Sequence, residues 1–132
     1  KLKVGDPTEE LDHIIGPLIN DRQADRVKHQ IEDAVKKGAK IELGGKVNGR
    51  FVDPTIITNI TSDMSLYQDE TFGPVVFVMP FKSDEEAVNI ANDTEYGLSS
   101  GVITKDEYRG LEIAQKLETG MCHINCSSVN WK

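Results

Sequence analysis

The sequence predicts an α/β protein with a partly parallel sheet and flanking helices. In its second half, short apolar runs at residues 75–79, 102–104 and 121–124 alternate with amphipathic stretches, and the connections between them are short. Strands that alternate with helices in this way are typical of right-handed parallel crossovers. We therefore expect the three runs to be parallel strands of one sheet.

Residues 75–79 form the most hydrophobic run of the chain. They include no polar residue and are rich in β-branched and aromatic side chains, and Pro74 and Pro80 bound them. Prolines at the two ends fall where the hydrogen-bond ladder needs no N–H group. This run is therefore predicted to be a central strand that is buried on both faces.

The first half of the chain predicts one clear helix and several shorter elements. Asn20 precedes Gln23 by three residues, as in a capping box, and apolar residues then recur at helical intervals up to Lys37, just before Gly38. The other elements predicted for this half are a half-exposed strand at 40–43, a hairpin-like return through 48–49 to 50–52, an edge or connecting strand at 54–60, and a short turn or helical piece at 62–68.

Two further helices are predicted from capping boxes. Ser83 precedes Glu86, and Thr104 precedes Glu107, with the spacing at which two side chains satisfy free N–H groups where a helix begins. Gly120 is expected to end the second of these helices. Its apolar stripe consists of Leu111, Ala114 and Leu117.

The composition argues against several classes of function. The 132 residues include 22 acidic and 15 basic ones, and the basic residues are scattered, so nucleic acid is not an expected partner. No apolar stretch approaches the roughly 18 residues of a membrane helix, and no signal-like segment opens the chain. We expect a single cytoplasmic domain over residues 1–132, or a fragment of one, and the lack of an initiator methionine favours a fragment.

The cysteines and histidines predict no catalytic or metal centre. Cys122 and Cys126 are too close together in an extended segment for a disulfide, and they lack the partners of a zinc site, so buried or inert thiols are favoured. None of His13, His29 and His123 has a nucleophile or base beside it in sequence. No residue of the chain is therefore assigned a catalytic role.

Residues 69–73, directly before the apolar run, include side chains that could hold part of a cofactor. Glu70 supplies a carboxylate for a vicinal diol, Phe72 supplies an apolar ring, and Gly73 allows the backbone to approach a ligand closely. The same residue types also fit a plain turn before a strand. On residue type alone, both interpretations stay open.

Several motifs resemble those of the aldehyde dehydrogenase superfamily in their order and spacing. They are Val4-Gly5-Asp6-Pro7, Gly16-Pro17-Leu18-Ile19, Phe51-Val52-Asp53-Pro54-Thr55, the E-x-F-G-P-V pattern that begins at Glu70, Ala91-Asn92-Asp93-Thr94-Glu95-Tyr96-Gly97-Leu98, and Ile124-Asn125. The resemblance covers nearly the whole chain. It implies the C-terminal part of the catalytic domain of an enzyme that oxidises an aldehyde to a carboxylic acid with NAD or NADP.

The resemblance also implies roles for individual residues. Glu70 would hydrogen-bond the nicotinamide ribose and Phe72 would pack beside the nicotinamide, so that both orient the cofactor. The family lines its aldehyde channel after the last strand, which makes Ser128, Asn130 and Trp131 candidate substrate-binding residues; a tail with no such role is the alternative. The motif around them resembles members that act on aromatic aldehydes such as benzaldehyde or vanillin.

The family's catalytic cysteine, general-base glutamate and nucleotide-binding domain have no counterpart in the sequence. No G-x-G-x-x-G follows a strand, and the glycines at 44–45 and 49 are too loosely spaced to form one. The resemblance therefore implies a fragment that is inert alone, from a homo-oligomeric parent. The alternatives are a stand-alone non-catalytic α/β binding module and a reductase of the same superfamily that acts on an acyl-phosphate or acyl-CoA.

Overall fold

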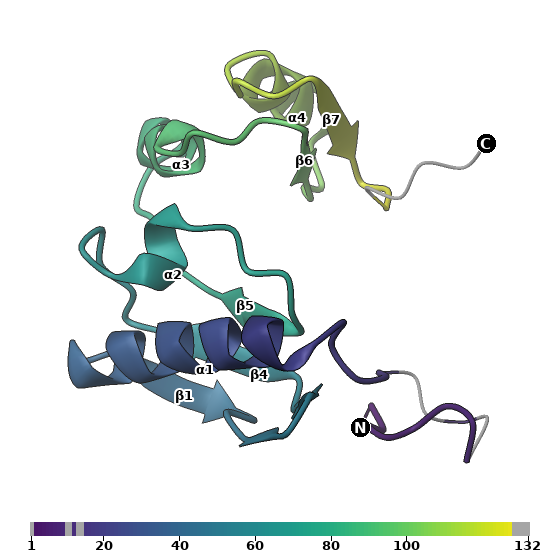
Figure 1. Ribbon diagram of the computed structural model, residues 1–132. Coiled ribbons are helices and arrows are strands. Elements are labelled where there is room, and N and C mark those ends of the chain that lie inside the picture. The colour runs from purple at the N-terminus through teal and green to yellow at the C-terminus, as the bar shows by residue number, and fades with distance from the viewer. Residues whose placement is uncertain (1, 10–11, 13–14, 128–132) are drawn as a thin grey trace. The chain divides into compact units, whose positions relative to one another are not determined.

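The computed structural model describes residues 2–9, 12 and 15–127, and the chain divides into two compact units, Lys1–Met79 and Pro80–Lys132 (Figure 1). Each unit has its own helices and its own paired strands. Whether the two units together make one domain stays a prediction. Among the helices of the described residues, none is both long enough and apolar enough to cross a membrane.

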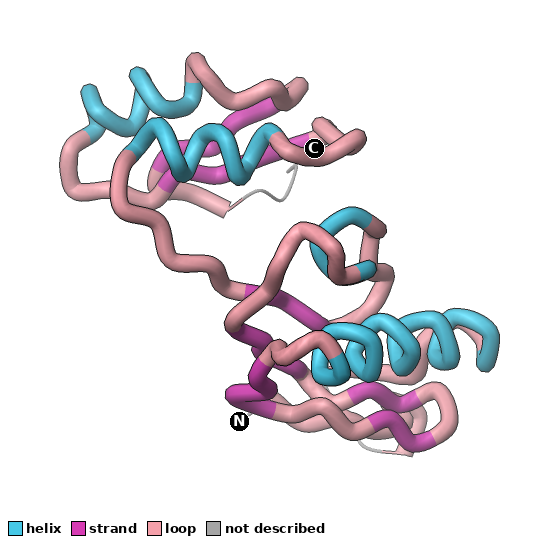
Figure 2. Tube along the Cα trace, turned by 90° about the vertical axis from the view of Figure 1, so that its left-hand side faces the viewer, coloured by secondary structure: helices cyan, strands magenta, loops and turns pink. Residues whose placement is uncertain are grey.

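The first unit is built from one long helix and a three-stranded sheet. The sheet has the order β1 (Lys40–Leu43), β4 (Thr55–Thr58), β5 (Val75–Phe77), with β1 antiparallel and β5 parallel to β4. The helix α1 (Asp21–Lys36) lies beside these strands, as Figures 1 and 2 both show. Their shared core includes Val27, Ile31 and Ala34 of α1 and Ile57 of β4.

The β2–β3 hairpin, the helix α2 and the cap of α1 agree with the sequence predictions. A hairpin joins β2 (Val47–Asn48) to β3 (Phe51–Val52), and Gly49 in its turn has a φ of +55°, a conformation that costs glycine little. The single-turn helix α2 (Ser65–Gln68) lies within the predicted range 62–68. Asn20 caps α1, because its Oδ1 accepts a hydrogen bond from the N–H of Gln23 at 2.9 Å.

Two strand predictions for the first unit are wrong. The sequence predicts an edge or connecting strand for β4, but it is the middle strand of the sheet, with Thr55 and Ile57 almost fully buried. β5 was expected to be central but occupies an edge, and the side chains of Val76 and Phe77 are 55% and 38% exposed. The polar residues that suggested an edge lie at the ends of β4, and Thr55 satisfies its own hydroxyl by donating to the carbonyl of Asp53 at 2.7 Å.

The second unit is a strand–helix–strand crossover preceded by a helix. After α3 (Asp84–Asn92), the strands β6 (Ser99–Val102) and β7 (Met121–Ile124) pair in parallel, and α4 (Glu107–Ala114) connects and contacts them. Gly110 lets α4 lie close to Thr104, the second residue after β6, because a Cβ atom at position 110 would stand 2.8 Å from Cγ2 of Thr104. The parallel pairing and the intervening helix confirm the predicted crossover.

The prediction that residues 75–79 share one sheet with the other two strands is wrong. β5 pairs with β4, whereas β6 and β7 form a separate two-stranded sheet. The range 102–104 is also misplaced, because β6 ends at Val102. The N–H of Thr104 donates to Oδ1 of Asn125 at 2.8 Å instead of continuing the ladder.

The capping boxes are confirmed only in part. Ser83 Oγ accepts from the N–H of Glu86 at 3.2 Å, but the Glu86 carboxylate accepts from the N–H of Lys82 rather than of Ser83. The second capping box is wrong, since Asp106 caps α4 by accepting from the N–H of Arg109 at 3.1 Å. This helix also ends at Ala114 rather than continuing to Gly120, so Leu117 lies beyond it.

Candidate functional site

The loop at residues 69–73 connects α2 to β5, and hydrogen bonds fix both of its ends. The N–H of Asp69 donates to the carbonyl of Ser65 at 2.9 Å, which closes the last turn of α2. The N–H of Thr55 donates to the carbonyl of Pro74 at 2.8 Å, which ties the other end to the central strand β4. The loop is therefore held by the sheet and by a helix end.

The two predicted cofactor residues, Glu70 and Phe72, both project to the surface from this loop. The Phe72 side chain is 68% exposed, and Glu70 is exposed as well. Among residues 2–9, 12 and 15–127, none hydrogen-bonds the Glu70 carboxylate. A carboxylate without other partners can accept hydrogen bonds from the two hydroxyl groups of a diol. An exposed ring face can pack against a planar group.

A surface hollow of about 590 Å³ adjoins the loop and includes the Phe72 ring in its wall. Most of the wall is apolar, and Glu70 is not part of it. The lining residues are Pro17, Leu18, Ile19, Gln23, Thr71, Phe72 and Gly73. Apolar hollows with a few polar groups at the rim are typical of small-molecule sites.

Two contacts with α1 hold the middle of the loop, and sequence reasoning did not find them. Nε2 of Gln23 donates to the carbonyl of Phe72 at 3.1 Å, and Oγ1 of Thr71 donates to Oε1 of Gln30 at 3.2 Å. A capping box predicts that the Gln23 side chain hydrogen-bonds the N–H of Asn20. In the structure this side chain hydrogen-bonds the loop instead. The available signal was Gln30 itself, a polar residue inside the apolar stripe of an amphipathic helix.

The predicted substrate residues Ser128, Asn130 and Trp131 lie outside the described residues, so their role stays a prediction. The structure shows the turn that leads toward them. Asn125, directly after β7, has a φ of +54°, and its N–H donates to the carbonyl of Val102 at 2.9 Å. The chain therefore leaves β7 through a left-handed residue, a conformation that asparagine adopts more readily than most side chains.

Cys122 and Cys126 are both free thiols, and neither is buried, since Cys122 is partly exposed and Cys126 is exposed; that they are inert stays a prediction. The fold places Sγ of Cys126 3.6 Å from Nδ1 of His123, a contact that the sequence analysis did not expect. Nε2 of His123 is buried and has no hydrogen-bond partner among the described residues. The imidazole is thus oriented by packing in β7 and by one weak sulfur contact.

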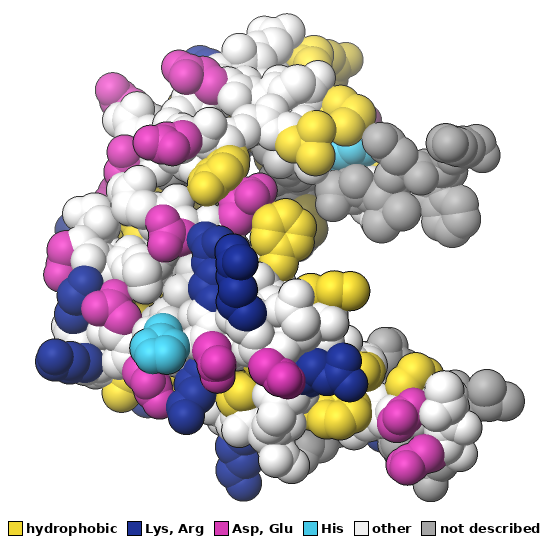
Figure 3. Space-filling model, viewed as in Figure 1, with side chains coloured by type: hydrophobic (Ala, Val, Ile, Leu, Met, Phe, Trp, Pro, Cys, Tyr) yellow, Lys and Arg dark blue, Asp and Glu magenta, His cyan; other side chains and the backbone are white. Residues whose placement is uncertain are grey.

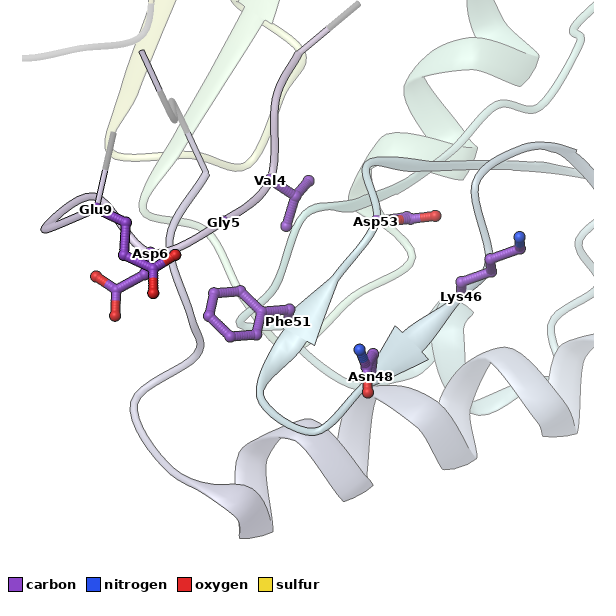
Figure 4. Close-up of a pocket in the computed structure, with 8 residues that line it drawn as sticks. All are labelled: Val4, Gly5, Asp6, Glu9, Lys46, Asn48, Phe51 and Asp53. Atoms are coloured by element: carbon purple, nitrogen blue, oxygen red, sulfur yellow. The ribbon is translucent and has the colours of Figure 1, made fainter. Parts of the chain in front are cut away.

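A second hollow of about 530 Å³ lies in the first unit, between the N-terminal segment and the β2–β3 hairpin. Figure 4 shows Asp6 and Glu9 near each other on one side of the Phe51 ring, with Lys46 and Asp53 on the other side. The charges are mixed, and Asp6 already accepts from the N–H of Thr8 at 2.8 Å. Within the part of the chain that the structure describes, no three His, Cys, Asp or Glu side chains are grouped to hold a metal ion.

A third, mostly apolar hollow of about 390 Å³ lies in the second unit between α3, α4 and β6. An ion pair stands at its wall, in which Nε of Arg109 lies 2.7 Å from Oδ2 of Asp84. The Arg109 guanidinium lowers the pKa of the Asp84 carboxyl below its ordinary value. This pair joins the N-terminal ends of α3 and α4, so it has a structural use within the unit.

Comparison with known proteins identifies the family. The chain is 48% identical over 130 residues to benzaldehyde dehydrogenase YfmT of Bacillus subtilis, a match that covers 98% of this chain and 26% of that protein. The fold superposes with a TM-score of 0.95 on a salicylaldehyde dehydrogenase from Pseudomonas putida G7 complexed with salicylaldehyde, at 42% identity over 100% of this chain and 27% of that one.

A second solved structure is an aldehyde dehydrogenase of Mycobacterium tuberculosis complexed with NAD⁺, with a TM-score of 0.90 and 36% identity over 97% of this chain and 27% of that one. The chain thus spans about a quarter of the length of the relatives that it matches. The sequence model of the aldehyde dehydrogenase family matches residues 1–131. The resemblance inferred from the motifs is therefore confirmed, and the chain belongs to the aldehyde dehydrogenase family.

Proposed function

We propose that this chain forms part of an NAD(P)-dependent aldehyde dehydrogenase, in which its 69–73 loop positions the nicotinamide end of the cofactor. Members of the family use NAD or NADP, and one of the matched structures contains NAD⁺. The observation that carries the proposal is the pair of exposed side chains, Glu70 and Phe72, which form no hydrogen bond with any described residue and stand on a loop whose two ends are hydrogen-bonded in place.

The chemistry of the two side chains fits the two parts of a nicotinamide nucleoside. A ribose presents two neighbouring hydroxyl donors, and the ionised Glu70 carboxylate offers two acceptor oxygens. The exposed Phe72 ring provides an apolar face for a planar heterocycle. When bound, NAD or NADP accepts the hydride that the oxidation of an aldehyde releases; the two residues contribute orientation rather than bond making.

We further propose that the substrate is an aromatic aldehyde, contacted by Ser128, Asn130 and Trp131. The proposal is supported by the identity to a benzaldehyde dehydrogenase and by the turn at Asn125, which directs the chain away from the end of a parallel strand. Open α/β sheets bind ligands at such carboxyl ends.

The cell compartment and the oligomeric state belong to the same proposal. A cytoplasmic location is proposed on the family resemblance. The enzyme is proposed to be a homo-oligomer on the family resemblance alone.

The decisive experiment replaces Glu70 in a full-length aldehyde dehydrogenase that contains this segment. Glu70→Gln retains the size of the side chain but loses one acceptor oxygen and the charge. We expect a loss in kcat/KM for the cofactor worth about 1.5–3 kcal/mol, the usual value of a hydrogen bond to a charged group. Steady-state kinetics with benzaldehyde and varied NAD⁺ and NADP⁺ measure it.

The matched control is Asp69→Asn, which removes the same charge one residue away in the same loop. Asp69 is exposed, and its carboxylate has no described partner. We expect near wild-type kinetics for this variant. If Glu70→Gln behaved like Asp69→Asn, the ribose contact would be refuted.

A further inference from the structure

One face of α1 supports the loop that bears Glu70 and Phe72. Gln23, Val27 and Gln30 stand at positions i, i+4 and i+7 of the helix, so they form a single row of side chains along it. Each of the three contacts the loop. We propose that Gln23 and Gln30 are positioning residues, which set where Glu70 and Phe72 stand relative to the cofactor. This inference rests on the proposed function of the loop.

The two glutamines hold successive residues of the loop. Oε1 of Gln30 accepts a hydrogen bond from Oγ1 of Thr71 at 3.2 Å, and Nε2 of Gln23 donates to the carbonyl of Phe72 at 3.1 Å. Thr71 stands between Glu70 and Phe72 in sequence, so its side chain is tied to the helix while its two neighbours face outward. Fixing Thr71 and the Phe72 carbonyl restricts the backbone on the C-terminal side of Glu70.

Val27 lies between the two glutamines and meets the next residue of the loop. A Cβ atom on Gly73 would stand 3.0 Å from Cγ2 of Val27, which is fully buried in the core of the unit. The absence of a side chain at Gly73 therefore lets the loop lie directly on the helix. The row Gln23, Val27, Gln30 thus contacts three consecutive loop residues.

The environment of Gln30 indicates a role beyond packing. Its side chain is only 3% exposed, and its Nε2 has no hydrogen-bond partner among the described residues. Burying an amide with one unsatisfied group costs stability that an apolar residue of similar size would not cost. At this position the helix carries a side chain that fixes Thr71 at the expense of stability.

The test uses Gln23→Met and Gln30→Met in a full-length aldehyde dehydrogenase that contains this segment. Methionine keeps the length of glutamine and removes its amide. We expect the KM for the nicotinamide cofactor to rise about threefold to tenfold in each variant, as expected for one lost hydrogen bond. The KM for benzaldehyde should stay unchanged, because the proposed aldehyde contacts are Ser128, Asn130 and Trp131 rather than residues of this loop.

Thr71 provides an internal check on Gln30. Thr71→Val removes the hydroxyl with little change of shape and should raise the cofactor KM as much as Gln30→Met does. The two changes combined should have no more effect than either alone, since they break the same hydrogen bond. Thr71→Ser, which restores a hydroxyl, should restore the wild-type KM.

Ile31→Val is the control for a merely structural effect. Ile31 lies next to Gln30 on α1, is 4% exposed and belongs to the core cluster. Its variant should lower the melting temperature without changing the cofactor KM. A wild-type cofactor KM in both glutamine variants, alongside a defective Glu70→Gln, would overturn this inference alone. A wild-type Glu70→Gln would overturn the role of the loop and this inference with it.

Discussion

Gly73 is the residue at which the loop and the helix come closest. Its φ is not in the left-handed region, so the reason for glycine here is space rather than backbone conformation. The space is limited by Cγ2 of Val27, 3.0 Å from where a Cβ atom would stand. Because Val27 is packed on all sides, an added methyl group would displace the loop or strain the helix.

Gly73→Ala should therefore destabilise the first unit by about 1–3 kcal/mol, the usual cost of overpacking. In a Val27→Ala background the same change should cost less, because the shortened side chain leaves room for the new methyl group. Urea unfolding of the four proteins of this cycle measures the free energies. If the losses of unfolding free energy in the two single variants simply added in the double variant, residue 73 and Val27 would not be in contact.

Sequence reasoning named the two exposed candidate residues, Glu70 and Phe72, and missed the contacts that hold their loop to α1. Glu70 and Phe72 were identified because their motif is local, within six residues of one another and of the following strand. The contacts of Gln23 and Gln30 join residues 49 and 41 positions apart. No periodicity within one segment encodes such pairs, since they depend on which helix face meets which loop.

At the scale of elements, Asp33 links α1 to α2. Its Oδ2 accepts from the N–H of Ser65 at 3.0 Å and from Nζ of Lys37 at 3.1 Å. Ser65 opens α2, so the carboxylate satisfies one of the free N–H groups at that helix start. The backbone hydrogen bond from Ser65, followed by the hydrogen bond from Lys37, lowers the pKa of Asp33 below its usual 3.8.

This link predicts how stability depends on pH. A carboxyl whose pKa is lower in the folded state stabilises that state above the unfolded pKa, and the contribution is lost as the pH falls through the folded pKa. Urea unfolding from about pH 5 down to about pH 2 should show stability falling, and Asp33→Asn should fall less steeply. Asp25→Asn, an exposed carboxylate on the same helix with no described partner, should keep the wild-type slope.

The strands show where element prediction succeeds and where it fails. The parallel pair β6 and β7 was predicted because the helix between them forces a crossover, which is a local property of the chain. The position of β5 in its sheet was not predicted. A run of apolar residues indicates that a strand is buried, but it does not show which strands or helices cover it. Val76 and Phe77 of β5 are 55% and 38% exposed, so the hydrophobic run that predicts a central strand includes an edge strand instead.

At the scale of the whole molecule, large apolar side chains stand on the surface of both units, as the yellow patches of Figure 3 show. In the first unit Val76 and Val78 are about half exposed, and in the second Leu98 and Ile103 are 80% and 92% exposed. Exposed apolar surface of this kind usually marks contacts with further protein. It fits a chain that covers about a quarter of the length of its relatives.

The 132-residue chain alone should neither oxidise aldehydes nor bind NAD with useful affinity. Catalysis by this route needs a nucleophilic thiolate, a general base and a phosphate-binding helix terminus, and the sequence has no matching motif for any of them. One ribose carboxylate and one ring contact are too few to offset the entropy lost when a large, flexible dinucleotide is immobilised.

Isothermal titration of this chain with NAD⁺ and NADP⁺ should show no saturable binding, and benzaldehyde should yield no absorbance of reduced nicotinamide. Cys122→Ser and Cys126→Ser variants separate the possible causes of a contrary result. Turnover that disappears with either cysteine would identify a nucleophile, most simply Cys126 beside His123. NAD binding tighter than about 10 µM could also persist in both cysteine variants and be lost in Glu70→Gln. This result would mean that the 69–73 loop and the α1 residues that contact it are sufficient to bind the nucleotide.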